Sequence, residues 1–183
     1  MSSITPLTAD HADALRRFFE ELPDEDVTSV KEDVRDPASV DAAVEDTRAS
    51  RWVAVEDGEV AAYASLLPGV GLSAHVGELR LVVSRQHRRK GLGRAMARTV
   101  MLAALNDGLS KVMVEVPANQ ESTAEVFRRL DFEGEALLRD HVRDRNGRLS
   151  DLLVLAHFAN ENSSILSALG VDEAADQAAN VVS

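Results

Sequence analysis

A basic turn with two glycines, placed between an apolar strand and a long amphipathic helix, constrains the fold of this chain most strongly. The run from Val76 to Val83 has strand character, and Leu92 to Leu105 carries apolar residues at helical spacing. The turn, from Arg88 to Gly93, reads Arg-Arg-Lys-Gly-Leu-Gly. The first N–H groups of a helix have no acceptor within the helix, and its dipole favours an anion there. Because the two glycines leave room for a phosphate to approach the main chain, the unit predicts a diphosphate-binding site.

The spacing of the glycines decides which kind of diphosphate site is predicted. A dinucleotide-binding fingerprint needs a third Gly or Ala at position 96, where this chain has Met96. A triphosphate-binding loop needs Gly-Lys-Ser or Gly-Lys-Thr, which the chain lacks. The pattern that matches is Arg-x-x-Gly-x-Gly, from Arg88 to Gly93. A solvated helix start is the alternative, although two glycines in the first turn of a helix are costly without a purpose.

The composition excludes several other classes of function. There is no cysteine among the 183 residues, which excludes disulfides, thiolate zinc sites and a cysteine nucleophile. The net charge of −11 argues against nucleic-acid binding, which needs a basic face. No apolar run approaches the roughly 20 residues of a membrane span, and the first residues do not resemble a signal peptide. We therefore expect a cytoplasmic protein without a membrane or nucleic-acid partner.

Local periodicity predicts an α+β protein with a mixed sheet and the element order β-α-α-β-β-β-α-β-α-β-β. Hairpin turns are predicted at Asp57-Gly58 and Asn146-Gly147. The helices are predicted to start after Thr8, after Asp36 and at Leu92, and a shorter fourth helix carries Thr123, Phe127 and Leu130 on its inward face. The predicted strands are Ile4 to Leu7, Trp52 to Val55, Val60 to Leu67, Val76 to Val83, Val112 to Val116, Ala136 to Val142 and Leu149 to His157.

The Arg-x-x-Gly-x-Gly pattern, in its place within this succession of elements, resembles the GNAT acetyltransferase superfamily, in particular its small bacterial and archaeal members. The resemblance implies a three-layer α/β/α fold, whose mostly antiparallel seven-stranded sheet is splayed between strands 4 and 5. It assigns residues 1–159 to an acetyltransferase domain. Residues 160–183 form a C-terminal tail, for which an appendage and a weak helix around Ile165 to Leu169 are both open.

The resemblance also implies a chemical activity. The protein would transfer an acetyl group from acetyl-CoA, its co-substrate, to a primary amine in a direct ternary complex and without a metal. The acceptor would be a small-molecule amine or a peptide amine, such as a protein lysine or N-terminus. A catalytically weak acyl-CoA-binding sensor is the alternative. The oligomeric state is open, and a homodimer is one option.

The same resemblance assigns residues to the cofactor site. The main chain of Val82 and Val83 would pair with the pantetheine amides, and the Val83 N–H would stabilise the oxyanion. The pyrophosphate would be held by main-chain amides in the segment Arg88, Arg89, Lys90, Gly91, Leu92, Gly93 and Arg94.

A second segment, from Asn119 to Phe132, resembles the family motif Asn-x-x-Ala-x-x-x-Tyr-x-x-x-Gly-Phe. Asn119 lies one residue farther from the aromatic residue than in the family, which leaves Gln120 in register. Asp131 replaces the family glycine and can tolerate a left-handed conformation. Phe127 replaces the tyrosine that often protonates the departing CoA thiolate, so that role would pass to water or be dispensed with. We place Asn119 and Phe127 at the cofactor site.

Glu78, on the strand that leads to the basic turn, is the first candidate for the general base that removes a proton from the amine. Several amine-acetylating members of the family carry a glutamate at this position. The alternative is an ordinary ion pair with Arg80, which shares a face of the strand by alternation. His75, at the start of the same strand, is a second candidate.

Three polar residues of the last predicted hairpin, Asp140, His141 and Asp151, resemble a pattern in a subgroup of bacterial GNAT proteins. They either line the acceptor pocket or brace the hairpin. We favour bracing, because most ion-pair networks are structural.

Overall fold

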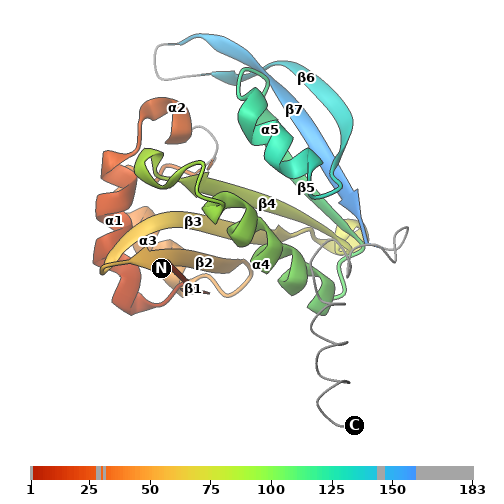
Figure 1. Cartoon of the computed structure of the whole chain (residues 1–183). Coiled ribbons are helices and arrows are strands. Elements are labelled where there is room, and N and C mark those ends of the chain that lie inside the picture. The colour runs from red at the N-terminus through yellow and green to blue at the C-terminus, as the bar shows by residue number, and fades with distance from the viewer. Residues whose placement is uncertain (1, 28–29, 31, 144–146, 160–183) are drawn as a thin grey trace, which may run out of the picture.

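The computed structural model describes residues 2–27, 30, 32–143 and 147–159, which form a seven-stranded sheet between helices (Figure 1). The strand order is β1-β2-β3-β4-β5-β7-β6, with β4 and β5 parallel and the other neighbouring pairs antiparallel. The predicted α+β class and mixed seven-stranded sheet are thereby confirmed. The predicted tail from residue 160 and Asn146 of the last predicted turn lie outside the described residues.

The predicted strands and helices are present with small shifts at their ends. The strands are β1 Ser3–Pro6, β2 Ser50–Glu56, β3 Glu59–Pro68, β4 Val76–Val83, β5 Lys111–Pro117, β6 Glu133–Arg143 and β7 Leu149–Phe158. The α-helices are α1 Ala12–Glu21, α2 Asp24–Val27, α3 Pro37–Glu45, α4 Leu92–Asn106 and α5 Glu121–Arg128. The short helix α2 was not predicted, because four residues cannot show helical periodicity. Within the described residues, no helix has the length and apolarity to cross a membrane.

The helix starts follow the predicted capping chemistry in part. The Asp36 side chain accepts a hydrogen bond from the Ala38 N–H at 3.0 Å, so it caps α3 as predicted. Thr8 was expected to cap the first helix directly, but it precedes a single 3₁₀ turn, Ala9–His11, and α1 follows from Ala12. The side chains of Thr8 and His11 hydrogen-bond to each other at 2.9 Å, which stabilises this extra turn.

The inward face of α5 also differs from the prediction. Ala124 and Phe127 are its buried residues, whereas Thr123 is half-buried. Leu130 is buried as expected but lies beyond the last helical residue.

Two hydrophobic cores lie on opposite faces of the sheet. On one face α1 and α3 pack against the sheet, and the ring of Phe19 meets the ring of Tyr63 edge-on at 5.2 Å between centroids. On the other face α4 and α5 cover the sheet, where Phe127 and Leu79 belong to the same buried cluster. This arrangement of helices on both faces confirms the predicted three layers.

Strands β4 and β5 pair over only part of their length. Their register runs from Val76 opposite Lys111 to Leu79 opposite Val114. The strands themselves continue to Val83 and Pro117 and diverge there (Figure 1). The predicted splay between strands 4 and 5 is therefore present, and it opens the sheet beside the start of α4.

We predict that Leu79→Ala destabilises the protein by about 2–5 kcal/mol, because it empties a buried site at the last paired position before the splay. Leu79 is 1% exposed. Leu72→Ala is the matched control, since Leu72 is 99% exposed and its loss should change stability by less than about 0.5 kcal/mol. Urea unfolding followed by circular dichroism measures both, and equal stability of the two variants would contradict this view of the core.

Candidate active site

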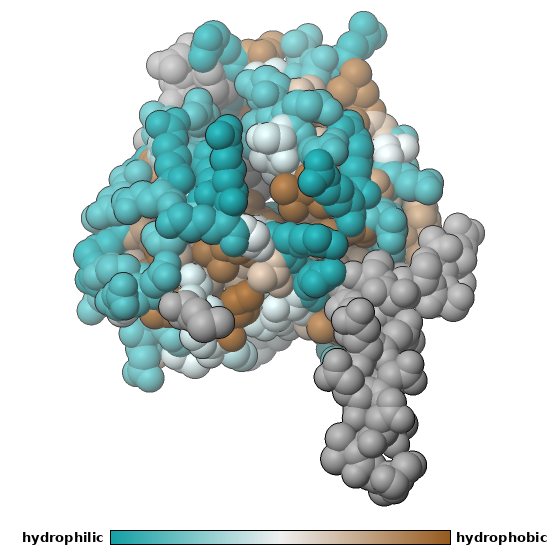
Figure 2. Space-filling view, in the orientation of Figure 1, coloured by the Kyte–Doolittle hydropathy of each residue, from teal (hydrophilic) through white to brown (hydrophobic). Residues whose placement is uncertain are grey.

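The splay between β4 and β5 contains a cavity. Figure 2, in the same orientation, shows a hollow with apolar groups inside and hydrophilic residues along its rim. Residues from β4, β5 and α5 line the cavity: Arg80, Leu81, Val114, Glu115, Val116, Pro117, Thr123 and Phe127. Thr123 and Phe127 project from α5, so this helix forms one wall.

The main chain of β4 presents hydrogen-bonding groups to the splay. The Ser84 N–H donates to the Ala61 carbonyl at 2.9 Å, on the β3 side, and the His75 carbonyl accepts from the Ser110 N–H at 2.9 Å, on the β5 side. Main-chain groups alternate along a strand. The N–H and C=O groups of Leu81 and Val83 therefore face the splay, whereas those of Val82 face β3.

The basic turn forms the predicted helix start. Arg89 and Gly91 have positive φ angles of 61° and 83°, and Gly91 is the residue that precedes α4. The first main-chain bond of the helix runs from the Ala95 N–H to the Gly91 carbonyl at 3.0 Å. The N–H groups that precede Ala95 in the helix have no acceptor within it. A Cβ added to Gly93 would lie 3.5 Å from Cγ2 of Val83, so the open helix start abuts the end of β4.

Positive charge surrounds this helix start, although the side chain of Arg88 is engaged elsewhere. Arg88, Arg89, Lys90 and Arg94 are exposed. Arg88 Nε donates to the Val83 carbonyl at 3.0 Å, and its Nη2 lies 2.6 Å from Oδ2 of Asp26. The Asp26 side chain is only 8% exposed. In this structure Arg88 therefore occupies the strand-edge carbonyl that the predicted pantetheine contact would use.

Helix α2, which the sequence did not predict, connects the two sides of the splay. On the β4 side, Glu25 forms an ion pair with Arg85, and Asp26 holds Arg88. On the α5 side, Nε2 of Gln120 donates to the main-chain carbonyl of Glu25 at 3.4 Å. Glu25 and Asp26 of this helix thus anchor the basic segment through their ion pairs with Arg85 and Arg88.

The second predicted segment begins where β5 ends. Gln120 is the residue that caps α5, and its Oε1 accepts from the Thr123 hydroxyl at 3.3 Å. Asn119 is exposed beside it. Phe127 is 2% exposed and packs edge-on against Phe132 at 5.3 Å between ring centroids, so it is a core residue that also lines the cavity. The positive φ predicted for Asp131 is present, at 61°.

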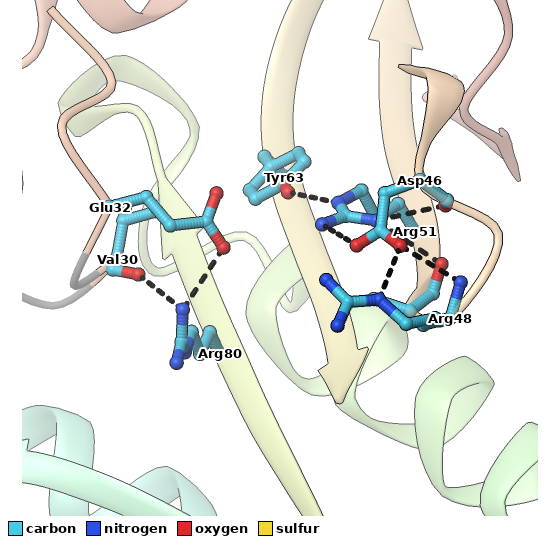
Figure 3. Close-up of polar contacts among 8 residues, drawn as sticks. Val30, Glu32, Asp46, Arg48, Arg51, Tyr63 and Arg80 are labelled. Carbon is cyan, nitrogen blue, oxygen red and sulfur yellow. Dashed lines mark hydrogen bonds and ion pairs between the residues drawn. The ribbon is translucent and has the colours of Figure 1, made fainter. Parts of the chain in front are cut away.

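Glu78 adopts the ion pair that the sequence analysis gave as the alternative. Arg80 donates from Nε and Nη2 to the two carboxylate oxygens of Glu78, at 3.0 and 3.3 Å. Nη1 of Arg80 reaches Oε1 of Glu32 at 3.0 Å and the Val30 carbonyl at 3.3 Å (Figure 3). A two-point contact of this kind is among the stronger ion pairs. Glu78 is not among the residues that line the cavity, and its predicted catalytic role stays a prediction.

Glu115 is a cavity residue that the sequence analysis did not single out. It lies on β5 between Val114 and Val116, which are buried against α4 and α5. Alternation directs the Glu115 side chain to the opposite face of the strand. A single charged residue within an alternating apolar strand was the available sequence signal. The sequence does not show that this residue lies where β4 and β5 separate, which places it in the cavity lining.

A second polar network lies beside the Arg80 cluster. Nε of Arg51 donates to the Tyr63 hydroxyl at 3.2 Å, and Nη2 donates to Oδ2 of Asp46 at 3.1 Å (Figure 3). The Arg48 main-chain N–H, together with Arg51, lowers the pKa of Asp46. Burial, assisted by the nearby charge of Glu32, raises the pKa of Tyr63. This network ties the connection between α3 and β2 to the sheet.

The remaining candidates lie away from the cavity or brace the hairpin. His75 precedes β4 at the end that pairs with β5, so the length of the strand separates it from the splay. The Asp140 N–H donates to Oδ1 of Asp151 at 3.0 Å, at an irregularity in the β6–β7 register. Bracing, the favoured interpretation, is therefore present for these two residues, and His141 is exposed nearby.

Comparison with known proteins places these features in a family. Residues 11–132 match the model of the Acetyltransferase (GNAT) family. Mouse N-acetyltransferase family 8 member 3 is 40% identical over 55 residues, which cover 30% of this chain but only 24% of that relative. The fold is similar to smu.2055 from Streptococcus mutans UA159, with a TM-score of 0.73, 19% identity, and coverage of 86% of this chain and 99% of that chain. It is also similar to ribosomal-protein-alanine N-acetyltransferase from Brucella melitensis, with a TM-score of 0.70, 19% identity, and coverage of 85% and 99%. At these identities the two structures support the fold alone.

We predict that the pKa of Tyr63, the single tyrosine of the chain, is raised above its ordinary value of 10.0 in the folded protein, because the hydroxyl is buried. Since the pKa is raised on folding, the stability gained from the neutral phenol is complete below pH 10.0 and declines as the pH rises toward the folded-state pKa. Ultraviolet absorbance of tyrosinate, recorded together with far-ultraviolet circular dichroism, measures this. Tyrosinate that forms near its ordinary pKa in a protein with native dichroism would contradict the burial of this hydroxyl.

Proposed function

The chain belongs to the Acetyltransferase (GNAT) family, and on that premise we propose that it transfers an acetyl group from acetyl-CoA to a primary amine by direct attack in a ternary complex. The observation that carries this proposal is that two sets of main-chain groups without a partner in the helix or sheet ladder lie next to each other. The start of α4 and the splay-facing edge of β4 meet at Gly93 and Val83. A ligand that carries a diphosphate and an extended amide arm is complementary to both.

The diphosphate of the cofactor fits the start of α4. The main-chain N–H of Arg88 donates to the Arg85 carbonyl at 3.4 Å, whereas those from Arg89 to Arg94 lie at or just before the start of α4, where anions are stabilised. The exposed cations Arg89, Lys90 and Arg94 add a favourable field. Acetyl-CoA is therefore the co-substrate that we propose, and the role of each residue in this segment is part of the proposal.

The pantetheine arm fits the splay. We assign its amides to the main-chain groups of Val83 and Leu81, because Val82, the other predicted partner, directs its own groups to β3. Phe127 would contact the arm from the α5 wall, and Asn119 would lie at its exposed end. Binding requires Arg88 to release the Val83 carbonyl.

Acetyl transfer at this position needs few groups from the protein. The neutral amine attacks the thioester carbon, and the Val83 N–H would stabilise the oxyanion that forms. The carbon–sulfur bond then breaks and CoA leaves as a thiolate. Because Phe127 has no proton to donate, water takes the proton that the attacking nitrogen loses and either delivers it to the thiolate or releases it to solvent. The proposed acceptor is a small-molecule or peptide amine.

A second candidate function is an acyl-CoA sensor without efficient catalysis. Phe127 favours it, because this position lacks the hydroxyl that would serve as an acid. A sensor would bind acetyl-CoA but release no thiol in the presence of amines. Thiol release with a panel of polyamines, amino acids, aminoglycosides and lysine peptides distinguishes the two functions.

We predict that CoA, but not NAD or ATP, stabilises the protein, by about 2.7 kcal/mol at a concentration 100 times its Kd. Gly93→Asp should weaken CoA binding at least tenfold, since it places a carboxylate beside the diphosphate while it suits a helix start. Gly134→Asp is the matched control, because a side chain there meets open space on β6. Calorimetric titration measures the affinities. Absence of CoA binding to the wild-type protein, or equal binding by both variants, would overturn the proposed site.

We also predict that Asp26→Asn strengthens CoA binding about 3- to 10-fold. Without the carboxylate, the release of Arg88 from residue 26 costs about 1 kcal/mol less, and CoA binding requires that release. Asp41→Asn, which removes a surface partner of Arg16, should leave the affinity unchanged. Weaker binding by Asp26→Asn would show instead that Asp26 orients Arg88 for the cofactor.

A further inference from the structure

We propose that Asp26, on α2, binds a second cationic group of the acceptor amine, so that aliphatic diamines are preferred over monoamines. The inference rests on the proposed acetyl transfer and adds the class of acceptor that it uses. Its basis is the burial of the Asp26 carboxylate, its position beside the splay, and the competition between Asp26 and the cofactor for Arg88.

The carboxylate of Asp26 is buried against a cation. Its side chain is 8% exposed, and Oδ2 is inaccessible to solvent. Within the described part of the chain, Asp26 forms its ion pair with Arg88, whose Nη2 lies 2.6 Å from Oδ2. A charge that is removed from water needs a partner, so the departure of Arg88 would leave this carboxylate uncompensated.

Cofactor binding draws this partner away. Nε of Arg88 donates to the Val83 carbonyl at 3.0 Å, at the strand edge that the pantetheine arm would occupy. Arg88 also belongs to the turn that leads into α4, where the diphosphate would bind, and Figure 1 shows α2 next to this turn. A guanidinium makes strong two-point contacts with phosphate oxygens, so the diphosphate competes with Asp26 for Arg88. Once Arg88 has turned to the cofactor, Asp26 needs another cation.

The vacated carboxylate lies close to the place of the reaction. Only the guanidinium of Arg88 separates the Asp26 carboxylate from the Val83 carbonyl, which faces the splay. The thioester would be held at the same residue, by the Val83 N–H. The reacting nitrogen must be neutral when it attacks, so it cannot stay paired with Asp26. A second cationic group of the acceptor can, and it would take the place of the Arg88 guanidinium.

The surrounding charges favour a cation at this position. Glu25, the neighbour of Asp26 on α2, is exposed and adds a negative charge. Arg80 is the one cation among the described residues that line the cavity, and it is paired with two carboxylates, Glu78 and Glu32. Arg80 therefore does not repel a second cation. The site would distinguish a diamine from a monoamine of the same size by one partly buried ion pair.

Tetramethylenediamine and pentylamine test the inference, because they have the same number of heavy atoms and differ in the second charge. The wild-type kcat/KM should be about tenfold or more higher for the diamine, beyond the statistical factor of about two for its equivalent amines. Asp26→Asn should lose this preference and keep or increase its affinity for CoA. Glu25→Gln, which removes the neighbouring exposed acid, is the matched control and should retain the preference whatever its effect on the rate.

A binding measurement tests the exchange of Arg88 without catalysis. Calorimetric titration of the wild-type protein with tetramethylenediamine should show binding about tenfold or more tighter in the presence of CoA, because Arg88 occupies Asp26 until CoA binds. Arg88→Gln should bind the diamine with a Kd that differs by less than about threefold with and without CoA.

The outcomes separate this inference from the proposed function. Equal preference in the wild type and Asp26→Asn, an equal loss in Asp26→Asn and Glu25→Gln, or diamine binding that does not depend on CoA overturns the role of Asp26 while the transferase stands. Wild-type protein that binds CoA but releases no thiol with any amine of the panel overturns the transferase, whereas the titration with the diamine still tests Asp26.

Discussion

The early end of the β4–β5 pairing is the constraint on which the rest of the site depends. A continuous ladder would satisfy the main-chain groups of Leu81 and Val83 within the sheet. Because pairing stops at Leu79 and Val114, these groups face a gap, and the first unpaired residues face each other across it. Two separate cores make this arrangement stable, since α4 and α5 cover one face of the opening and α1 and α3 support β4 from the other.

Charged residues hold the two sides of the opening in place. Arg88 links the end of β4 to α2, and Arg80 links β4 to Glu32 in the segment that follows α2. Both arginines are thus held by acids from the first third of the chain. The many acidic residues of this protein therefore have a structural role near the site, in addition to their effect on net charge.

The parts of the site that could be predicted from sequence are those whose chemistry is local. The basic turn combines a strand, two glycines and a helix within a short stretch, so periodicity and backbone freedom were sufficient to predict it. Asp36 at the start of α3 is a second such case. Glu115 and Asp26 could not be recognised in the same way, because each depends on contacts with segments far away in the sequence.

By itself, the sequence determined the order of the strands and of helices α1, α3, α4 and α5, the glycine-containing helix start at the basic turn and the absence of a hydroxyl at Phe127. These properties follow from periodicity and residue chemistry within one segment. Only the tertiary structure decided that Glu78 is held by Arg80, that Val82 faces β3 and that Asp26 holds Arg88. The physical reason is that hydrogen-bond direction and ion-pair choice depend on strand register and on the packing of distant segments, which a linear pattern does not contain.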